Sequence, residues 1–184
     1  MQTCRVHIVG AAGAGTTTLG RALASALAAS HHDTDDYFWL PTTPPYRQER
    51  DIADRVRLMR EVFLDRSDWV LSGSLDDWGS ALVPLFDLVV FVQVPTTIRV
   101  QRLREREARH FGRAATSPGG WRHRETEDFI DWAAHYDYGT AVGRSLPRHL
   151  AWLDMLSCPV MRIDGTRPVA DLVDAVIAAL RREG

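Results

Sequence analysis

The feature that most constrains the fold is a glycine-rich stretch near the start of the 184-residue chain, G-A-A-G-A-G-T-T-T at residues 10–18. A short apolar run, residues 6–9, precedes it, and an alanine- and leucine-rich segment with helical spacing follows it. Glycines permit positive φ angles and close approach of the backbone, so successive N–H groups can point inward at an anion. The N-terminus of the following helix adds its dipole. The order strand, loop, helix therefore predicts a phosphate-binding loop.

The stretch matches the Walker A pattern G-x-x-x-x-G-K-[ST] at all defined positions but one. Gly10, Gly15 and Thr17 match, whereas Thr16 stands where the pattern has lysine. The chain contains no lysine: its 22 basic residues are all arginine, so phosphate charge must be met by arginine, Mg²⁺ or backbone amides. The alternative is a glycine-rich turn without a ligand. The residues expected to contact the nucleotide are Gly10, Ala11, Ala12, Gly13, Ala14, Gly15, Thr16, Thr17 and Thr18.

Size and composition are those of one globular domain, which we expect to span residues 1–184. A hydrophobic content of 45% with 25% charged residues is ordinary for such a domain. The formal net charge of −2 gives no electrostatic reason to expect nucleic acid or an anionic membrane as a partner. Cys4 and Cys158 lie far apart in the sequence and are expected to be reduced thiols. Without a signal-like or membrane-spanning run, we expect a cytoplasmic protein, monomeric or homodimeric.

Apolar runs alternate with segments of helical periodicity along the rest of the chain. Strands are predicted to end near Asp33 and to occupy residues 69–71, 88–94 and 159–163. Helices are predicted after the loop, at about 48–66, from 96 or 97 to 111, around 128–135, at about 147–156 and after Pro168. The run 88–94 is almost wholly apolar, which indicates a strand covered on both faces. The alternation predicts an α/β layered fold with a parallel sheet.

Two carboxylates follow the expected second strand, Asp33 and Asp35. The carboxyl ends of the strands are where open α/β sheets bind ligands. Residues two apart in an extended segment point to the same side. A carboxylate beside an attacking hydroxyl can take its proton, whereas a phosphate acceptor is already an anionic nucleophile, so this pair favours a hydroxyl acceptor. The alternatives are a solvated acidic turn, or Asp33 as a helix cap.

An arginine-rich helix follows Pro95. Four arginines fall on one helical face at steps of three, four and three: Arg99, Arg102, Arg106 and Arg109. Arg102 and Arg106 are the candidates to clamp the β- and γ-phosphates, because the planar guanidinium fork suits phosphate oxygens. The alternative is a solvated face interleaved with acidic residues. Arg144 and Arg148 are candidates of lower rank, and whether Asp76, Asp77 and Trp78 contact an acceptor is left open.

With these features together, the chain resembles the P-loop kinases of the adenylate kinase-like group over nearly its whole length. The shared features are the loop, the acid-bearing second strand, a substrate-covering helical segment at 37–66 and an arginine-rich helix before a lid at about 110–125. Asp164-Gly165-Thr166 is similar to the adenine-side loop of that group, with Arg167 against the adenine. Residues 69–74 and 88–94 also resemble the small bacterial kinases known as topology-modulation proteins.

The resemblance implies a three-layer α/β/α P-loop NTPase fold with a five-stranded parallel sheet and a helical lid. It implies ATP with Mg²⁺ as the donor. In similar metabolite kinases a D-x-D pair divides its labour, which assigns Asp33, with Thr17, to Mg²⁺ and Asp35 to the acceptor hydroxyl. Two departures stand out. Ser72 occupies the place of a strand-end aspartate, and Thr16 that of the lysine, although the G-S-G-T-T-T loop of archaeal-type cytidylate kinases is similar in this respect.

Three functions are therefore open. The first is an ATP-dependent kinase acting on a small molecule, either a hydroxyl-bearing metabolite or a nucleotide. The second is a nucleoside monophosphate kinase in which Arg47, Arg50 and Arg57 bind the phosphate of the acceptor. The third is a nucleotide-binding regulatory module with weak catalysis, in which Thr16 and Ser72 mark lost activity.

Overall fold

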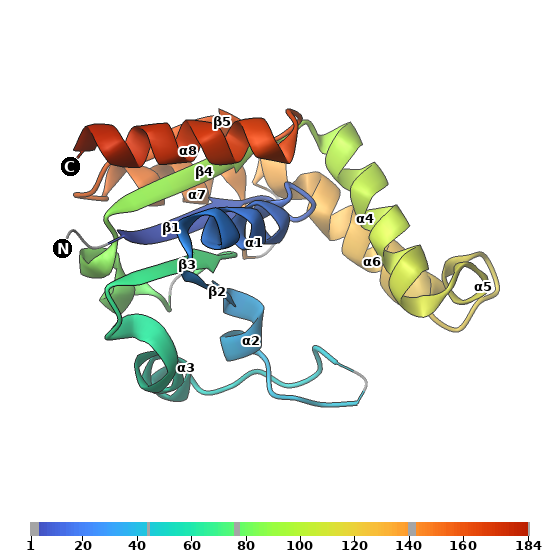
Figure 1. The fold of residues 1–184 in the computed structure, drawn as a ribbon. Helices are drawn as coiled ribbons and strands as arrows, with labels where there is room; N and C mark the ends of the chain where they lie inside the picture. The colour runs from blue at the N-terminus through green and yellow to red at the C-terminus, as the bar shows by residue number, and fades with distance from the viewer. Residues whose placement is uncertain (1–3, 44, 76–77, 140–142, 184) are drawn as a thin grey trace.

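The computed structural model describes residues 4–43, 45–75, 78–139 and 143–183, and its centre is one five-stranded sheet (Figure 1). The strands follow the order β2-β3-β1-β4-β5, and all four neighbouring pairs are parallel. Their bounds are Cys4–Gly10 (β1), Ser30–Asp33 (β2), Asp68–Ser72 (β3), Leu88–Gln93 (β4) and Val160–Asp164 (β5). The five-stranded parallel sheet expected from the sequence is thus confirmed.

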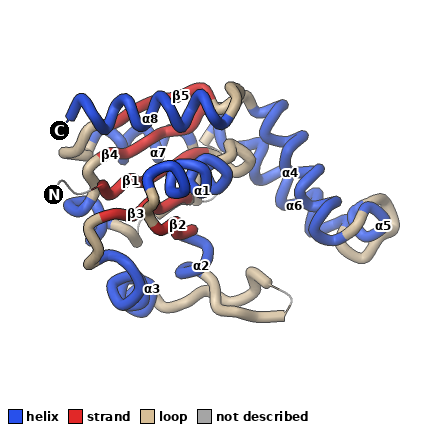
Figure 2. The backbone as a smooth tube through the Cα atoms, in the orientation of Figure 1, coloured by secondary structure: helices blue, strands red, loops and turns tan. Residues whose placement is uncertain are grey.

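Helices cover both faces of the sheet (Figure 2). The α-helices are Thr16–Leu27 (α1), Thr34–Phe38 (α2), Ile52–Met59 (α3), Thr96–Phe111 (α4), Arg113–Thr116 (α5), His123–Ala134 (α6), Leu146–Asp154 (α7) and Val169–Glu183 (α8). A π-helical turn, Arg60–Leu64 (η1), continues α3, and 3₁₀ turns lie at Ser80–Leu85 (η2) and His135–Tyr138 (η3). In the described part of the chain, no helix combines the length and apolar character needed to cross a membrane.

Alternate residues of the central strands enter two separate cores, which is why these strands are apolar almost throughout. Val6 and Ile8 of β1 are fully buried in the core that contains α1 and α8. Val9, next along the same strand, is buried in the other core, with Phe63 of η1 and Leu153 of α7. The result is a three-layer α/β/α arrangement, with the carboxyl ends of the strands at one edge.

The segment 37–66 is less helical than the sequence predicted. Residues 39–51, here called the covering loop, form an irregular hairpin in which Leu40 N–H donates to Gln48 (2.9 Å) and Arg50 N–H to Phe38 (2.7 Å). The prolines before Tyr46 exclude a helix there, and α3 begins only at Ile52, capped by the Asp51 carboxylate. Met59 and Phe63 are buried, whereas Ile52, in the first turn of α3, is 54% exposed.

The region around the predicted lid is a helical hairpin, α4 to α6, with α5 at its tip, and we call residues 96–134 the projecting hairpin (Figure 1). Neither Thr96 nor Thr97 caps α4 through its side chain, contrary to expectation, since the Thr96 hydroxyl donates to Asp137 instead. The guanidinium of Arg99 is buried and donates to the carbonyl of Ala133 (3.0 Å) and to Asp137 (3.1 Å). These bonds fix the base of the hairpin to the chain beyond it.

Candidate active site

The glycine-rich loop joins β1 to α1 at the carboxyl edge of the sheet. Gly13 and Gly15 have φ angles of +81° and +96°, in the left-handed region that favours glycine. A Cβ on Gly13 would lie 2.7 Å from the carbonyl oxygen of Arg99, and one on Gly10 would lie 2.7 Å from that of Val92. The glycines are therefore required both by backbone conformation and by close packing against β4 and α4.

The loop presents backbone donors without partners. The N–H of Ala14 donates to the carbonyl of Ala11 (3.0 Å). Among the described residues, no acceptor is recorded for the N–H groups of Ala11, Ala12, Gly13 and Gly15. Inward-facing unpaired amides at a helix N-terminus are the donors that bind phosphate oxygens. A loop of this kind could hold a polyphosphate, which is the ligand that the sequence pattern predicts.

The two residues expected to hold a metal ion lie side by side. Thr17 Oγ1 donates a hydrogen bond of 2.8 Å to Asp33 Oδ2, so the first turn of α1 meets the last residue of β2. The hydroxyl of Ser72 lies 3.5 Å from the same carboxylate oxygen and 2.9 Å from His31 Nε2. Hydroxyl and carboxylate oxygens are the ligands that Mg²⁺ prefers, and the donor set fits that ion. Ser72 therefore shares in this cluster without supplying a carboxylate.

No cluster of three or more histidine, cysteine or acidic side chains suited to a metal ion occurs among the described residues. A Mg²⁺ ion held by Thr17 and Asp33 would thus take its other ligands from the nucleotide and water, as Mg²⁺ commonly does with phosphates. The other oxygen of Asp33, Oδ1, accepts from the N–H of Asp35 (3.1 Å). Asp33 therefore also caps α2, so the capping role considered from the sequence coexists with the contact to Thr17.

Asp35 lies in the first turn of α2, not in an extended segment as predicted, because Asp33 starts a helix there. Its side chain remains accessible to solvent. The protein packed around it and the nearby Asp33 raise its pKa, while Arg144 and Arg106 act in the opposite direction. The charges of Asp33 and of two arginines therefore act on the Asp35 carboxylate.

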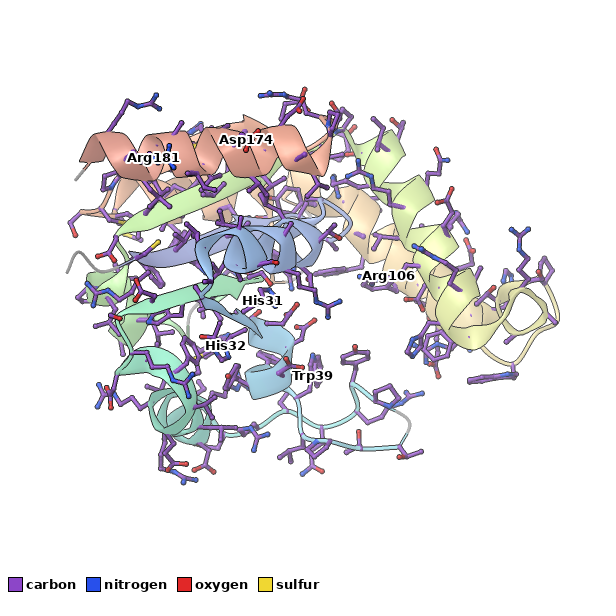
Figure 3. The ribbon with its side chains drawn as sticks, in the orientation of Figure 1. His31, His32, Trp39, Arg106, Asp174 and Arg181 are labelled. Atoms are coloured by element: carbon purple, nitrogen blue, oxygen red, sulfur yellow. The ribbon has the colours of Figure 1, made fainter. Side chains whose placement is uncertain are left out.

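Of the predicted arginine face, Arg102 reaches the loop. Its guanidinium donates to the carbonyl of Gly165 (3.1 Å) and to that of Ala14 (3.4 Å), which links α4, the loop and the turn after β5. Arg106 is half-exposed on the projecting hairpin (Figure 3), with its guanidinium 5.5 Å from the ring centroid of Phe129. Arg109 is exposed, and its Nε donates to the carbonyl of Glu105 in its own helix (3.4 Å).

The remaining sequence candidates are distributed around this edge. Arg167 is exposed beside Asp171 (3.9 Å) in the turn after β5. Trp78 is buried against Arg55, whereas Asp76 and Asp77 lie outside the described residues. His31 and His32 form hydrogen bonds with Ser72 and with Tyr37, respectively.

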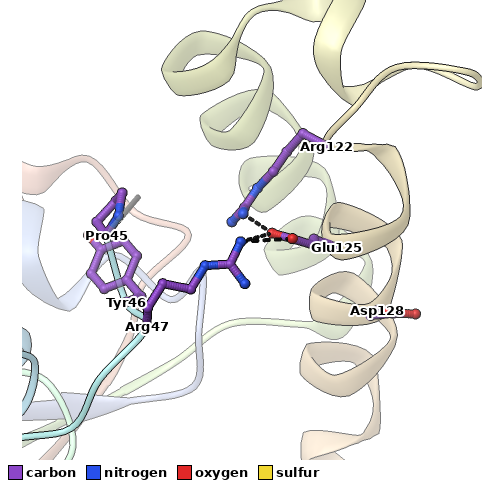
Figure 4. Close-up of a pocket in the computed structure, with 6 residues that line it drawn as sticks. All are labelled: Pro45, Tyr46, Arg47, Arg122, Glu125 and Asp128. Atoms are coloured by element: carbon purple, nitrogen blue, oxygen red, sulfur yellow. Dashed lines mark hydrogen bonds and ion pairs between the residues drawn. The ribbon is translucent and has the colours of Figure 1, made fainter. Parts of the chain in front are cut away.

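The tip of the covering loop contains contacts that the sequence pattern did not predict. Tyr46 has a φ angle of +63°, unusual for a non-glycine residue. Burial and the charge of Asp35 raise the pKa of Tyr46, whereas the charge of Arg106 lowers it. Arg47 pairs with Glu125 of α6 (2.8 Å), across a cavity of about 250 Å³ (Figure 4). No local pattern signals a contact between residues 78 positions apart.

The parallel sheet and its glycine-rich loop define the class as an α/β fold of the P-loop NTPase type. Among solved structures, the chain is similar to shikimate kinase from Acinetobacter baumannii, with 15% identity, a TM-score of 0.57 and coverage of 98% of this chain and 94% of that one. It is also similar to shikimate kinase from Bacteroides thetaiotaomicron, with 18% identity, a TM-score of 0.57 and coverage of 97% of this chain and 99% of that one. For a gluconokinase from Sinorhizobium meliloti 1021, the identity is 15%, the TM-score is 0.54, and the match covers 98% of this chain and 93% of that one. At such identities the likeness concerns the fold.

The family model of the AAA domain, AAA_18, matches residues 6–128, which span the glycine-rich loop, the covering loop and most of the projecting hairpin. The chain belongs to this AAA domain family. It is also 39% identical over 172 residues to the uncharacterized protein YqaC of Bacillus subtilis (strain 168), covering 94% of both chains. The chain is therefore a P-loop protein of this AAA domain family, with an overall fold that these solved structures share.

Proposed function

We propose that this chain is an ATP-dependent kinase that moves the γ-phosphoryl group of ATP to a small-molecule acceptor. The observation that carries the proposal is the convergence of three parts at one edge of the sheet. Unpaired amides of the loop lie beside the Thr17–Asp33 pair, and Asp35 follows on the next helix. Phosphoryl transfer needs positioning and charge neutralisation more than covalent chemistry, and these parts supply both.

The loop residues 10–18 would hold the phosphates of ATP, and Thr17 with Asp33 would hold Mg²⁺. When bound, Mg²⁺ neutralises charge on the phosphate oxygens. Arg102 is proposed to supply the cationic side chain that Thr16 cannot, because its guanidinium already contacts the loop carbonyl of Ala14. Arg106 would add a second positive charge from the projecting hairpin, and Arg167 would lie against the adenine.

Asp35 is proposed to orient the acceptor hydroxyl and take its proton. The raised pKa of Asp35 makes its carboxylate a stronger base than that of an ordinary aspartate. The similar structures carry the names shikimate kinase and gluconokinase, which agrees with a small-molecule acceptor.

The nucleoside monophosphate kinase alternative, and with it a place in the adenylate kinase-like group, has less support from the arginines it requires. Arg50 donates to the backbone of Tyr37 (3.0 Å), and Arg57 pairs with Asp54 and Glu61 on the surface of α3. Only Arg47 of these three borders the cavity beside the site. The regulatory alternative rests on Thr16 and Ser72, and the contact of Arg102 with the loop offsets the first of these losses.

The test is ADP release by the full chain with ATP and Mg²⁺ over a panel of hydroxy acids, sugars, nucleosides and nucleoside monophosphates. The proposal predicts release stimulated by a hydroxyl-bearing member and abolished by Asp35→Asn, with ATP binding retained. Asp36→Asn is the matched control, because Asp36 is the next, exposed carboxylate of the same turn and is assigned no role. Release stimulated only by monophosphates, or unaffected by Asp35→Asn, would refute the assignment of Asp35.

A further inference from the structure

A cavity of about 250 Å³ separates the tip of the covering loop from the start of α6. One wall is formed by Pro45, Tyr46 and Arg47, and the other by residues of the projecting hairpin, Arg122, Glu125 and Asp128. Figure 4 shows Arg47 and Arg122 pointing toward one another from opposite walls, with Glu125 between them and Asp128 directed away. Two cationic groups of distant segments therefore meet at one carboxylate.

The contacts at Glu125 are those of an anion held by two arginines. Nη2 of Arg47 donates to both of its oxygens, at 2.8 Å to Oε1 and 3.0 Å to Oε2. Nη1 of Arg122 also contacts Oε2. The hydrogen bond from Arg47 and the charges of both guanidinium groups lower the pKa of Glu125, so the carboxylate stays ionised. Charge-assisted contacts of this kind are the way in which proteins bind carboxylates and phosphates.

The pair across the cavity is exchangeable. The side chains of Arg47 and Glu125 are 49% and 42% exposed, and ion pairs with such exposure contribute little to folding. Arg122 is instead held in place: its side chain is 14% exposed, and its guanidinium lies 4.3 Å from the ring centroid of Phe111. An anion from solution that replaced Glu125 would therefore find one arginine already positioned and the other free to adjust.

The cavity adjoins the proposed acceptor side of the active site. Tyr46 lines it, and the same residue lies close enough to Asp35 and Arg106 for both to affect its pKa. Its left-handed backbone conformation turns the chain at the tip of the covering loop, directly before Arg47. A molecule whose hydroxyl lies at Asp35 thus has this cavity as a neighbouring place for a second group.

We propose that Arg47 and Arg122 form a subsite for an oxyanionic group of the acceptor, a carboxylate or a phosphate. Glu125 occupies this subsite until the acceptor displaces it. The subsite narrows the acceptor to a small hydroxyl compound that carries such a group, and in this respect the inference rests on the proposed kinase function. Glu125 is a positioning residue that competes with the ligand and takes no part in phosphoryl transfer.

The test is a residue-resolved NMR titration of the full chain, with its loop filled by Mg²⁺ and ADP. Acetate and inorganic phosphate are the two probes, and the backbone signals of Arg47 and Arg122 report on the subsite separately from those of residues 10–18. Glu125→Gln removes the internal competitor and is expected to tighten binding of one probe by about two- to fivefold, the worth of an exposed ion pair. The probe that gains more identifies the group as carboxylate or phosphate.

Glu127→Gln is the matched control. Glu127 lies on α6, as Glu125 does, and pairs with Arg104 of α4; the side chains of Arg104 and Glu127 are 49% and 41% exposed, and Glu127 does not line the cavity. The Glu127→Gln variant should bind acetate and phosphate as the wild type does. Glu125→Ala, which also removes the carboxylate, should bind the probe as tightly as Glu125→Gln. Adding Arg47→Gln to Glu125→Gln should abolish the increase in affinity.

The proposal is overturned if neither Glu125 variant tightens binding relative to Glu127→Gln, or if the gain survives without Arg47. A protein that fails to bind ADP would count against the kinase function instead. In that case the acetate titration on the nucleotide-free chain still decides the subsite, since acetate is a poor substitute for a polyphosphate in the loop.

Discussion

Thr17 and Asp33 are joined by a hydrogen bond of 2.8 Å between the first turn of α1 and the end of β2. The hydroxyl and the carboxylate oxygen thus face one another where the phosphates of a nucleotide would end. This contact is the basis of the proposed Mg²⁺ site, since both groups are oxygen ligands.

Replacing Thr17 by valine keeps the shape of the side chain and removes the hydroxyl. We expect affinity for ATP in the presence of Mg²⁺ to fall by about tenfold, the effect of losing roughly 1.4 kcal/mol from a charged, hydrogen-bonded site. Affinity measured with EDTA should hardly change. Isothermal titration under both conditions provides the measurement, with Thr97→Val on the exposed start of α4 as the control. An equal loss with and without Mg²⁺ would contradict the metal assignment.

The second prediction concerns stability at Asp35. Its folded pKa is raised above the unfolded value, so its contribution to folding is most favourable when it is protonated at low pH, and it is lost as the pH rises through the folded pKa. Asp35→Asn should therefore not lower the melting temperature at pH 7, and should raise it slightly relative to wild type. That advantage should disappear near pH 3. Melting curves at the two pH values check this, and a clear destabilisation at pH 7 would show a structural role.

The third prediction concerns Arg102, whose guanidinium connects the carbonyls of Ala14 and Gly165. Arg102→Gln should weaken ATP binding by about tenfold or more, because hydrogen bonds to charged groups contribute about 1.5–3 kcal/mol. Arg104→Gln is the control: it lies two residues away on α4 and pairs with Glu127 at the surface. Equal ATP affinities of the two variants, by the same titration, would mean that Arg102 does not replace the missing lysine.

The fourth prediction separates conformation from packing at Gly13. Gly119 has a similar φ angle of +85°, and a Cβ added there would meet nothing within 4 Å, so Gly119→Ala should cost only about 1–2 kcal/mol for the left-handed conformation. Gly13→Ala adds a contact of 2.7 Å with the carbonyl of Arg99, and should cost more and impair ATP binding. Urea unfolding of the two variants compares these costs. Equal free energies of unfolding would show that the loop can move away from α4.

Much of the fold follows from local pattern. The run 88–94 is apolar because β4 is buried on both faces. β1 is buried in the same way, since Val6 and Ile8 enter one core and Val9 enters the other. The phosphate-binding loop was also predictable, since its glycines, its preceding strand and its following helix are consecutive. The helix cap at Asp33 was harder to predict. Because Asp33 begins α2, Asp35 lies in a helical turn and not in the extended segment expected for it.

The remaining discrepancies depend on long-range packing. Arg99 falls on the same helical face as Arg102 in the sequence pattern. In the structure, however, α6 and η3 cover Arg99, and its hydrogen bonds to them give it a structural role. The pairing of Arg47 with Glu125 depends on how the covering loop meets the projecting hairpin, and no sequence periodicity encodes that meeting. The residues that stabilise the fold are therefore easier to predict from the sequence than those that surround the candidate site.

The central claim is that the loop binds ATP with Mg²⁺ despite lacking lysine. Its most direct test is isothermal titration of the wild-type chain with ATP, with Mg²⁺ and then with EDTA. We expect saturable binding at one site per chain that is tighter with Mg²⁺. The absence of binding at millimolar ATP, or binding indifferent to Mg²⁺, would contradict it.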